Sequence, residues 1–231
     1  MPEGAQVNAM FGRIAERYDL ANRLLSFGID RIWRDRLVDE VEWRQPKRAL
    51  DLATGSGDVA FALSRALPES VEIRALDFCE PMIERAKLKQ ATLGNDRIDF
   101  SVGDILSLPI ESGWADATTI AFGYRNLENR AAGLLEMKRV LRKETGHLFI
   151  LEFSQPHPIY RPFYYYYLKT LMPNMASLIT GDKAAYQYLS ESIEAFPDRK
   201  GISQELREAG FSVVEAIPLA FGSVALHIAR A

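Results

Sequence analysis

The chain has 231 residues, 48% of them hydrophobic and 26% charged, with a formal net charge of -3, as expected for a soluble globular protein. Without an overall basic field, we expect no nucleic-acid partner. The single Cys79 excludes an internal disulfide and a cysteine metal cluster, and the three histidines lack metal-ligand spacing, so no metal site is predicted.

The length fits one large domain, or one domain with an added helical subdomain, and we expect residues 1–231 to form a single domain. No apolar run reaches the roughly 18–20 residues that span a bilayer. The first 20 residues carry charges where a signal peptide would be apolar, at Glu3, Arg13, Glu16, Arg17 and Asp19. We therefore expect a cytoplasmic protein.

The N-terminal region is predicted to be helical over residues 7–43, because apolar side chains recur there at helical spacing. The Ser26-Phe27-Gly28 segment should divide it into separate helices. We expect residues 7–45 to form a helical cap.

After Pro46, predicted strands alternate with predicted helices. The strands are expected at 48–52, 71–77, 98–102, 115–122 and 147–153, and the helices at 58–67, 81–93 and 131–141. This alternation predicts a parallel sheet with right-handed crossovers over residues 46–156.

Residues 157–199 interrupt the alternation with Pro158, Pro162 and Pro173, the run Tyr164–Tyr167 and many apolar residues, and predict a lid of irregular helices. Residues 200–231 then predict a helix over 202–209, stopped by Gly210, and two strands at 212–217 and 224–229. A terminal antiparallel hairpin favours the methyltransferase version of the doubly wound α/β sheet over a nicotinamide-binding one.

A glycine turn follows the first predicted strand, in the run Ala49-Leu-Asp-Leu-Ala-Thr-Gly-Ser-Gly-Asp58. Gly55 and Gly57 permit a tight turn, and Asp77 lies at the distance along the chain where an acid accepts ribose hydroxyls. The run lacks the lysine of a phosphate-binding loop and the spacing of a serine hydrolase elbow. The pattern predicts an adenosine-type ligand.

Further motifs lie around this turn. They are Phe11-x-x-Ile-Ala-x-x-Tyr18-Asp19-x-x-Asn22, Leu25-Ser26-Phe27-Gly28 with Trp33, Phe122-Gly123-Tyr124-Arg125-Asn126, Leu151-Glu152-Phe153-Ser154, Tyr188-Leu189-x-x-Ser192-Ile193 and Val224-Ala225-Leu226-His227. Together they resemble the ubiquinone/menaquinone biosynthesis C-methyltransferases over roughly residues 7–229. The resemblance implies a class I methyltransferase fold, with a Rossmann-like seven-stranded sheet, S-adenosylmethionine as methyl donor and a prenylated quinol as acceptor, either demethylmenaquinol or a ubiquinol precursor.

Three positions depart from the pattern of that family. Ser56 stands where threonine is usual and keeps the hydroxyl, whereas Ala121 replaces a serine and removes a side-chain bond to the cofactor. Asp30 replaces a common histidine, which puts any titratable role at that position in doubt.

Three aspartates end successive predicted strands, where ligands of such sheets bind. The resemblance assigns Asp51 to the cofactor's ammonium, Asp77 to the ribose, and Asp104 to the adenine amino group; the alternative is that they are solvated turn residues. The full predicted cofactor set is Asp51, Gly55, Ser56, Gly57, Asp77, Phe78, Asp104, Ile105 and Ala121.

Arg125 is the predicted catalytic residue, because a guanidinium could stabilise a phenolate oxygen or polarise a water. Arginine stays protonated and is a poor direct base. The alternative is a surface salt bridge with Glu128 or a neighbouring acid. The predicted substrate-binding residues are Tyr18, Asn22, Phe122, Asn126 and Tyr188, and helix packing is an alternative for the two N-terminal residues among them.

The apolar, tyrosine-rich stretch 159–179 suits an ordinary lid, a cover over an isoprenoid tail, a peripheral membrane contact at the inner face of the membrane, or a homodimer contact. Three other functions stay open at this point: a methyltransferase of another small molecule, an NAD-dependent reductase, and a non-catalytic scaffold for quinone biosynthesis.

Overall fold

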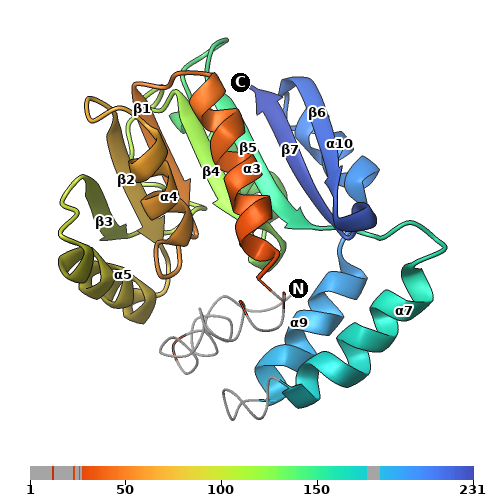
Figure 1. Ribbon diagram of the computed structural model, residues 1–231. Helices are drawn as coiled ribbons and strands as arrows, with labels where there is room; N and C mark the ends of the chain where they lie inside the picture. The colour runs from red at the N-terminus through yellow and green to blue at the C-terminus, as the bar shows by residue number, and fades with distance from the viewer. Residues whose placement is uncertain (1–11, 13–22, 24–25, 27, 176–182) are drawn as a thin grey trace.

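The computed structural model describes residues 12, 23, 26, 28–175 and 183–231 (Figure 1). Within this part, a seven-stranded sheet runs in the order β3-β2-β1-β4-β5-β7-β6. The strands are β1 (Arg48–Leu52), β2 (Glu72–Asp77), β3 (Ile98–Val102), β4 (Ala117–Ala121), β5 (His147–Phe153), β6 (Ser212–Leu219) and β7 (Val224–Arg230). The first five pair in parallel, and β7 runs antiparallel to β5 and β6. The predicted fold class is confirmed.

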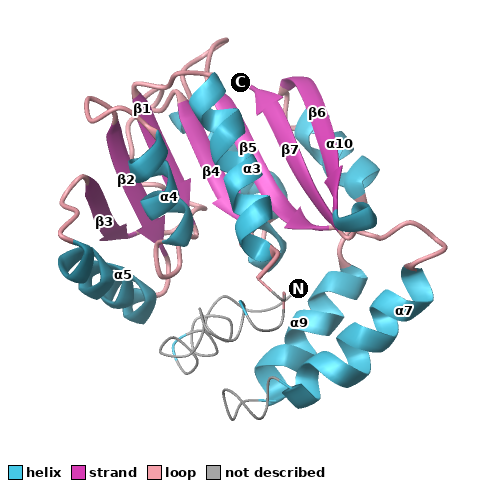
Figure 2. Cartoon of the chain, viewed as in Figure 1, coloured by secondary structure: helices cyan, strands magenta, loops and turns pink. Residues whose placement is uncertain are grey.

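Helices cover both faces of the sheet (Figures 1 and 2). On one face, α3 (Asp30–Trp43), α4 (Asp58–Ala66) and α5 (Glu80–Leu93) bury apolar side chains in a common core. On the other, α6 (Arg130–Val140) and α10 (Arg199–Glu208) do the same. Along β5, Phe149 and Leu151 belong to the first core, and Leu148 and Ile150 to the second, because strand side chains alternate between faces.

The predicted lid lies beyond the end of the sheet toward which the arrows of β4 and β5 point (Figure 1). It consists of α7 (Arg161–Tyr166), a π-helical turn η2 (Tyr167–Leu171) and α9 (Lys183–Ala195). A third apolar cluster joins them, and it includes Leu168, Met172 and Ile193. The expected irregular helices are confirmed for the described part of this region. The division into cap, core, lid and terminal hairpin stays a prediction.

The order of the strands reverses between β1 and β4. From this pair, β2 and β3 extend the sheet in one direction, and β5 extends it in the other. Ligands of open parallel sheets bind beyond the carboxyl ends of the strands at such a point. Two short 3-10 turns, η1 (Tyr124–Asn126) and η3 (Ala220–Gly222), follow β4 and β6. The end of β1, the end of β4 and η1 therefore define where a site should lie.

Candidate active site

A cavity of about 190 Å³ opens at this point, between the carboxyl ends of β1 and β4 and the lid. The segment after β1, the segment after β4 and the lid all contribute to its walls. Representative wall residues are Asp51, Ser56, Phe122, Arg125, Tyr164 and Tyr188. The fold thus brings together residues that lie far apart in the sequence.

The backbone is strained at both strand ends. Ala53 after β1 has a φ of 49° and Phe122 after β4 a φ of 57°, a region that costs non-glycine residues roughly 1–3 kcal/mol. Both residues line the cavity. A Cβ added to Gly123 would lie 2.5 Å from the Cβ of Ala53, so the close approach of these two turns requires glycine there. Such strain is typical of functional sites.

The two glycines of the turn after β1 serve different purposes. Gly55 has a φ of 57°, and nothing lies within 4 Å of the position its Cβ would take. Gly57 has a φ of 87°, and an added Cβ would meet the rings of Phe61 and Phe100 at 2.9 Å. Gly55 leaves an open face for a ligand, whereas Gly57 is required by packing at the start of α4.

Asp77 holds this turn against the end of β2. Its carboxylate accepts hydrogen bonds from the backbone N–H of Gly55 (2.7 Å) and of Cys79 (2.8 Å). Burial raises the pKa of Asp77, and these backbone bonds counteract the shift. The aspartate that sequence spacing singled out therefore shapes the glycine turn in this structure.

Asp51 lies at the base of the cavity and is only 1% exposed. Its two oxygens accept hydrogen bonds from the hydroxyls of Thr54 and Thr119, each at 2.6 Å. Burial raises the pKa of Asp51 to about 6, although the two hydroxyls oppose the shift. Among the described residues, none forms an ion pair with this carboxylate, so a cationic ligand group would suit it.

The structure places seven of the predicted residues on the cavity wall: Asp51, Gly55, Ser56, Ala121, Phe122, Arg125 and Tyr188. Asn126 lies behind Tyr188, whose hydroxyl donates to its side-chain oxygen at 3.1 Å. Tyr18 and Asn22 lie outside the described residues.

The residues predicted around adenine lie away from the cavity wall. Phe78 is 47% exposed, and the exposed Asp104 caps its own turn by accepting from the backbone N–H of Leu106 at 2.8 Å. The side chain of Ile105 packs in the core beneath α6. Their roles toward a nucleoside stay predictions.

Arg125 does not form the surface salt bridge considered as its alternative role. Its side chain is 4% exposed, and Nη1 donates to Oε1 of Glu152 at 2.9 Å and to the backbone carbonyl of Phe122. The second oxygen of Glu152 accepts the backbone N–H of Arg125 at 3.1 Å. Sequence reasoning gave Glu152 no role, although a single acid in an apolar strand was a usable signal.

Close to Glu152, two buried hydrogen-bond donors have no partner within the described part of the chain. They are Nε of Arg125 and the hydroxyl of Tyr164, and both residues line the cavity. Burial, reinforced by the neighbouring Tyr165, raises the pKa of Tyr164, so its hydroxyl stays protonated. Unsatisfied buried donors cost about 1–3 kcal/mol each, and a ligand oxygen would satisfy them. Nothing in the sequence distinguished Tyr164 from its neighbours in the tyrosine run.

Comparison with known proteins assigns a family to this arrangement. The sequence profile of the ubiE/COQ5 methyltransferase family matches residues 2–231. The chain belongs to this family. It is 43% identical to a protein of Thermus thermophilus named demethylmenaquinone methyltransferase, over 95% of this chain and 98% of that one. It is 39% identical to the ubiquinone/menaquinone biosynthesis C-methyltransferase of Citrifermentans bemidjiense, over 98% and 96%.

Solved structures support the fold. An S-adenosylmethionine-dependent methyltransferase from Thermotoga maritima matches with a TM-score of 0.66 at 15% identity, over 96% of this chain and 98% of that one. One from Aquifex aeolicus matches with a TM-score of 0.59 at 19% identity, over 80% and 81%. The resemblance that the sequence motifs indicated, and the methyltransferase class it implied, are confirmed.

Proposed function

We propose that the protein transfers a methyl group from S-adenosylmethionine to a ring carbon of a prenylated quinol, either demethylmenaquinol or a demethylated ubiquinol precursor. The names of the relatives support this substrate class. The observation that carries the proposal is that a buried carboxylate and two unsatisfied buried donors belong to residues that line one cavity. The carboxylate suits the ammonium group of the methyl donor, and the two hydrogen-bond donors suit an oxygen of the methyl acceptor.

The residues around the cavity fit the donor. Asp51 offers a buried carboxylate, Gly55 an open backbone face, and Asp77 fixes the turn between them. When bound, S-adenosylmethionine supplies an electrophilic methyl group on a positively charged sulfur. The protein's own task is then to hold an electron-rich carbon in line with that methyl group.

The acceptor end of the cavity suits a phenolate oxygen. Loss of a quinol proton to water places negative charge on the oxygen and on the adjacent ring carbon. That carbon forms the bond to the methyl group as the bond between the methyl group and sulfur breaks, which leaves S-adenosylhomocysteine. The ring carbon then loses its own proton to water and the oxygen regains one, which restores the aromatic quinol. Nε of Arg125 and the hydroxyl of Tyr164 can donate to this oxygen as charge develops. Glu152 holds the guanidinium in place. Arg125 cannot itself take the proton, because a guanidinium in a protein already carries all its protons.

Incubation of the purified protein with labelled S-adenosylmethionine and two reduced acceptors, a demethylmenaquinol and a demethylated ubiquinol precursor, tests this function. Mass spectrometry of the product would identify the acceptor and the methylated ring carbon. Turnover of hydrophilic phenols without benefit from a prenyl tail would instead favour another small-molecule methyltransferase. Cofactor binding without turnover of any acceptor would favour a scaffold, and binding of NAD in its place a reductase.

Tyr164→Phe should lower the rate of methyl transfer about tenfold to a hundredfold, because one donor to the acceptor oxygen is removed. Affinity for S-adenosylmethionine should stay unchanged. Tyr166→Phe is the matched control, since Tyr166 lies on the same helix, is 62% exposed and should have no effect. Single-turnover kinetics would measure the rates; equal effects of both variants would contradict the role of Tyr164.

The lid also supports peripheral contact with a membrane, where prenylated quinols reside. Its outer side exposes Ile159, Phe163 and Tyr166 by 70%, 77% and 62%, while Tyr164 and Leu168 of the same segment line the cavity. Exposed aromatic and aliphatic side chains of this kind bind the interfacial region of bilayers. Among the described helices, none is long and apolar enough to cross a membrane.

The triple variant Ile159→Ser, Phe163→Ser and Tyr166→Ser should lower partitioning onto phosphatidylcholine vesicles about tenfold or more, because apolar surface available for burial is lost. The matched control is Leu88→Ser with Leu93→Ser, two residues of α5 that are 63% and 59% exposed. Vesicle co-sedimentation measures the effect. A triple variant that binds vesicles normally but turns from dimer to monomer would assign this face to a homodimer instead.

A further inference from the structure

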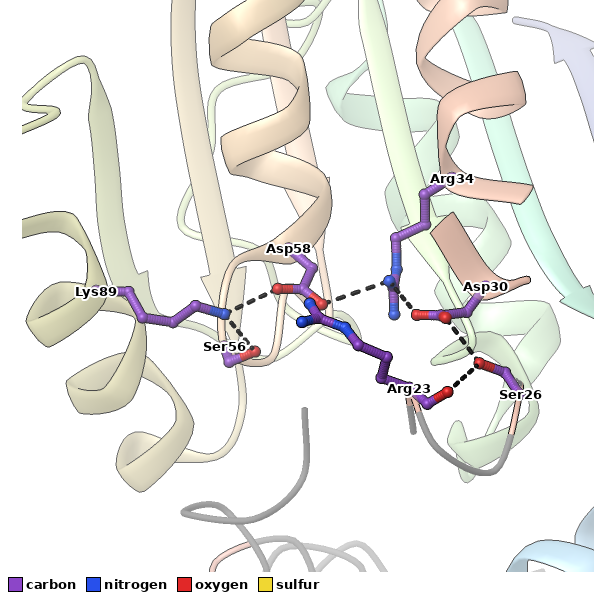
Figure 3. Close-up of polar contacts among 7 residues, drawn as sticks. All are labelled: Arg23, Ser26, Asp30, Arg34, Ser56, Asp58 and Lys89. Carbon is purple, nitrogen blue, oxygen red and sulfur yellow. Dashed lines mark hydrogen bonds and ion pairs between the residues drawn. The ribbon is translucent and has the colours of Figure 1, made fainter. Parts of the chain in front are cut away.

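A chain of charged side chains links α3 to the glycine turn at one wall of the cavity (Figure 3). Figure 3 shows the guanidinium of Arg34 between two carboxylates, and its Nη1 lies 2.6 Å from Oδ2 of Asp30 and 3.4 Å from Oδ2 of Asp58. On the other side, Nζ of Lys89 lies 2.8 Å from Oδ1 of Asp58 and 3.3 Å from Oγ of Ser56. Ion pairs thus connect α3 to the residues of the glycine turn and the start of α4.

Three cations among the described residues act on the carboxylate of Asp58. They are Arg34 and Lys89, which form ion pairs with it, and Arg23. Burial acts to raise the pKa of Asp58, yet its pKa is lowered, because the charges of Arg34, Lys89 and Arg23 outweigh burial. A ligand carboxylate at this wall of the cavity would lie close to the same cations.

Arg34 is the cation placed to receive that carboxylate. Among the described residues that line the cavity, the cations are Arg34 and Arg125. Arg125 lies at the acceptor end, where it pairs with Glu152, and not beside the glycine turn. Arg34 is 14% exposed and shares its wall with Asp58 and Ser56, directly beside the glycine turn.

We propose that Arg34 binds the α-carboxylate of the methyl donor while Asp51 binds its α-ammonium, an inference that rests on the proposed use of S-adenosylmethionine. The two groups stand on one carbon atom, so a site for them needs a cation and an anion that face the same cavity. Arg34 on α3 and Asp51 near the end of β1 meet this requirement, because both line the cavity. Hydrogen bonds between guanidinium and carboxylate are among the strongest in proteins.

Asp30 positions Arg34 for this task. Its Oδ2 accepts from Arg34 at 2.6 Å and its Oδ1 from the hydroxyl of Ser26 at 2.7 Å, and the side chain is buried. The bond to Ser26 fixes the orientation of the carboxylate, and the carboxylate in turn fixes the orientation of the guanidinium. The aspartate that replaces the usual histidine of the family is therefore a positioning residue here.

Calorimetric binding of two thioethers by the full-length protein tests the proposal. S-adenosylhomocysteine carries the amino-acid group, and methylthioadenosine lacks it, while both share the adenosine and an uncharged sulfur. Arg34→Met should weaken binding of S-adenosylhomocysteine about tenfold to a hundredfold and change binding of methylthioadenosine less than about threefold. The decarboxylated analogue of S-adenosylhomocysteine should bind both proteins alike, which separates the carboxylate from the ammonium.

Arg36→Met is the matched control, because Arg36 lies on the same helix, is 48% exposed and pairs with Glu40 at 2.6 Å. It should leave all three affinities unchanged, and Arg34→Lys should retain part of the lost affinity. Thermal unfolding shows whether each variant is folded. Because Arg34→Met leaves the carboxylate of Asp30 without its counter-charge, the double variant Arg34→Met with Asp30→Asn serves as a second variant in which that charge is removed as well.

Equal weakening of all three ligands by Arg34→Met, or no weakening of S-adenosylhomocysteine, would overturn the proposal. If the unaltered protein bound none of the three ligands, the proposed use of S-adenosylmethionine would fail instead. The two failures are therefore distinguishable in one set of titrations.

Discussion

Arg125→Met should lower the free energy of unfolding by about 3–5 kcal/mol, because it leaves the carboxylate of Glu152 buried without its counter-charge. Both side chains are nearly inaccessible, at 4% and 1% exposed, so solvent cannot replace the lost partner. For a protein of this size, the change corresponds to a fall in Tm of roughly 6–20 °C. Methyl transfer should fall about a hundredfold to a thousandfold.

The double variant Arg125→Met with Glu152→Gln separates stability from chemistry. It removes both charges, and the single amide oxygen of glutamine can still accept one of the two backbone N–H bonds that the two oxygens of Glu152 accept from Arg125 and Phe153. Part of the lost stability should return, whereas methyl transfer should stay low, because no guanidinium faces the acceptor. Calorimetric unfolding and single-turnover kinetics measure the two effects.

Lys169→Met is the control for this series. Lys169 and Glu194 form an ion pair of 2.7 Å in the lid, but their side chains are 51% and 46% exposed. Exposed pairs contribute only about 0–1 kcal/mol, so unfolding should hardly change. If the double variant regained methyl transfer together with stability, Arg125 would have a structural role alone.

The alternation of strands and helices was predictable because each strand is a short apolar run bounded by turn residues. Strands β1, β3 and β5 begin and end where the sequence indicated. The fourth strand was predicted too long, over 115–122. Ala115 forms only an isolated bridge with Leu141, and Phe122 turns out of the strand with a φ of 57°. The pattern of apolar residues does not indicate that a phenylalanine adopts a left-handed backbone conformation, because the free-energy cost of that conformation is offset by tertiary packing.

The candidate site was only partly predictable for a similar reason. Motif positions placed Asp51 and Arg125 on the cavity wall, since Asp51 lies near the end of β1 and Arg125 follows β4, and these two strands meet at the point of order reversal. The partners of these residues depend on three-dimensional packing. Glu152 reaches Arg125 from the next strand, and Arg34 reaches Asp58 from a helix that precedes the sheet. The local sequence around each residue does not predict these distances.

Asp51 should make the stability and the cofactor affinity of the protein depend on pH in opposite directions. Burial raises its pKa from 3.8 to about 6, so between these values the folded protein binds more protons than the unfolded chain. The stability contributed by the protonated carboxyl is present below pH 4 and is lost as pH rises through 6, by about 3 kcal/mol in total. The ionised form, which attracts an ammonium group, prevails above pH 6.

Asp51→Asn should therefore raise the free energy of unfolding at pH 8, by up to about 3 kcal/mol, while weakening S-adenosylmethionine binding about tenfold to a hundredfold. In the unaltered protein, cofactor affinity should fall by up to about tenfold per unit as pH decreases below 6, and the variant should lose this dependence. Calorimetric unfolding and titrations between pH 5 and 8 measure both quantities, with Asp99→Asn, an exposed carboxylate of β3, as the control. A variant that binds the cofactor as tightly as before would remove Asp51 from the site. A variant that binds weakly and is more stable would show that burial of this charge costs the protein folding free energy and that the cofactor's ammonium group recovers it on binding.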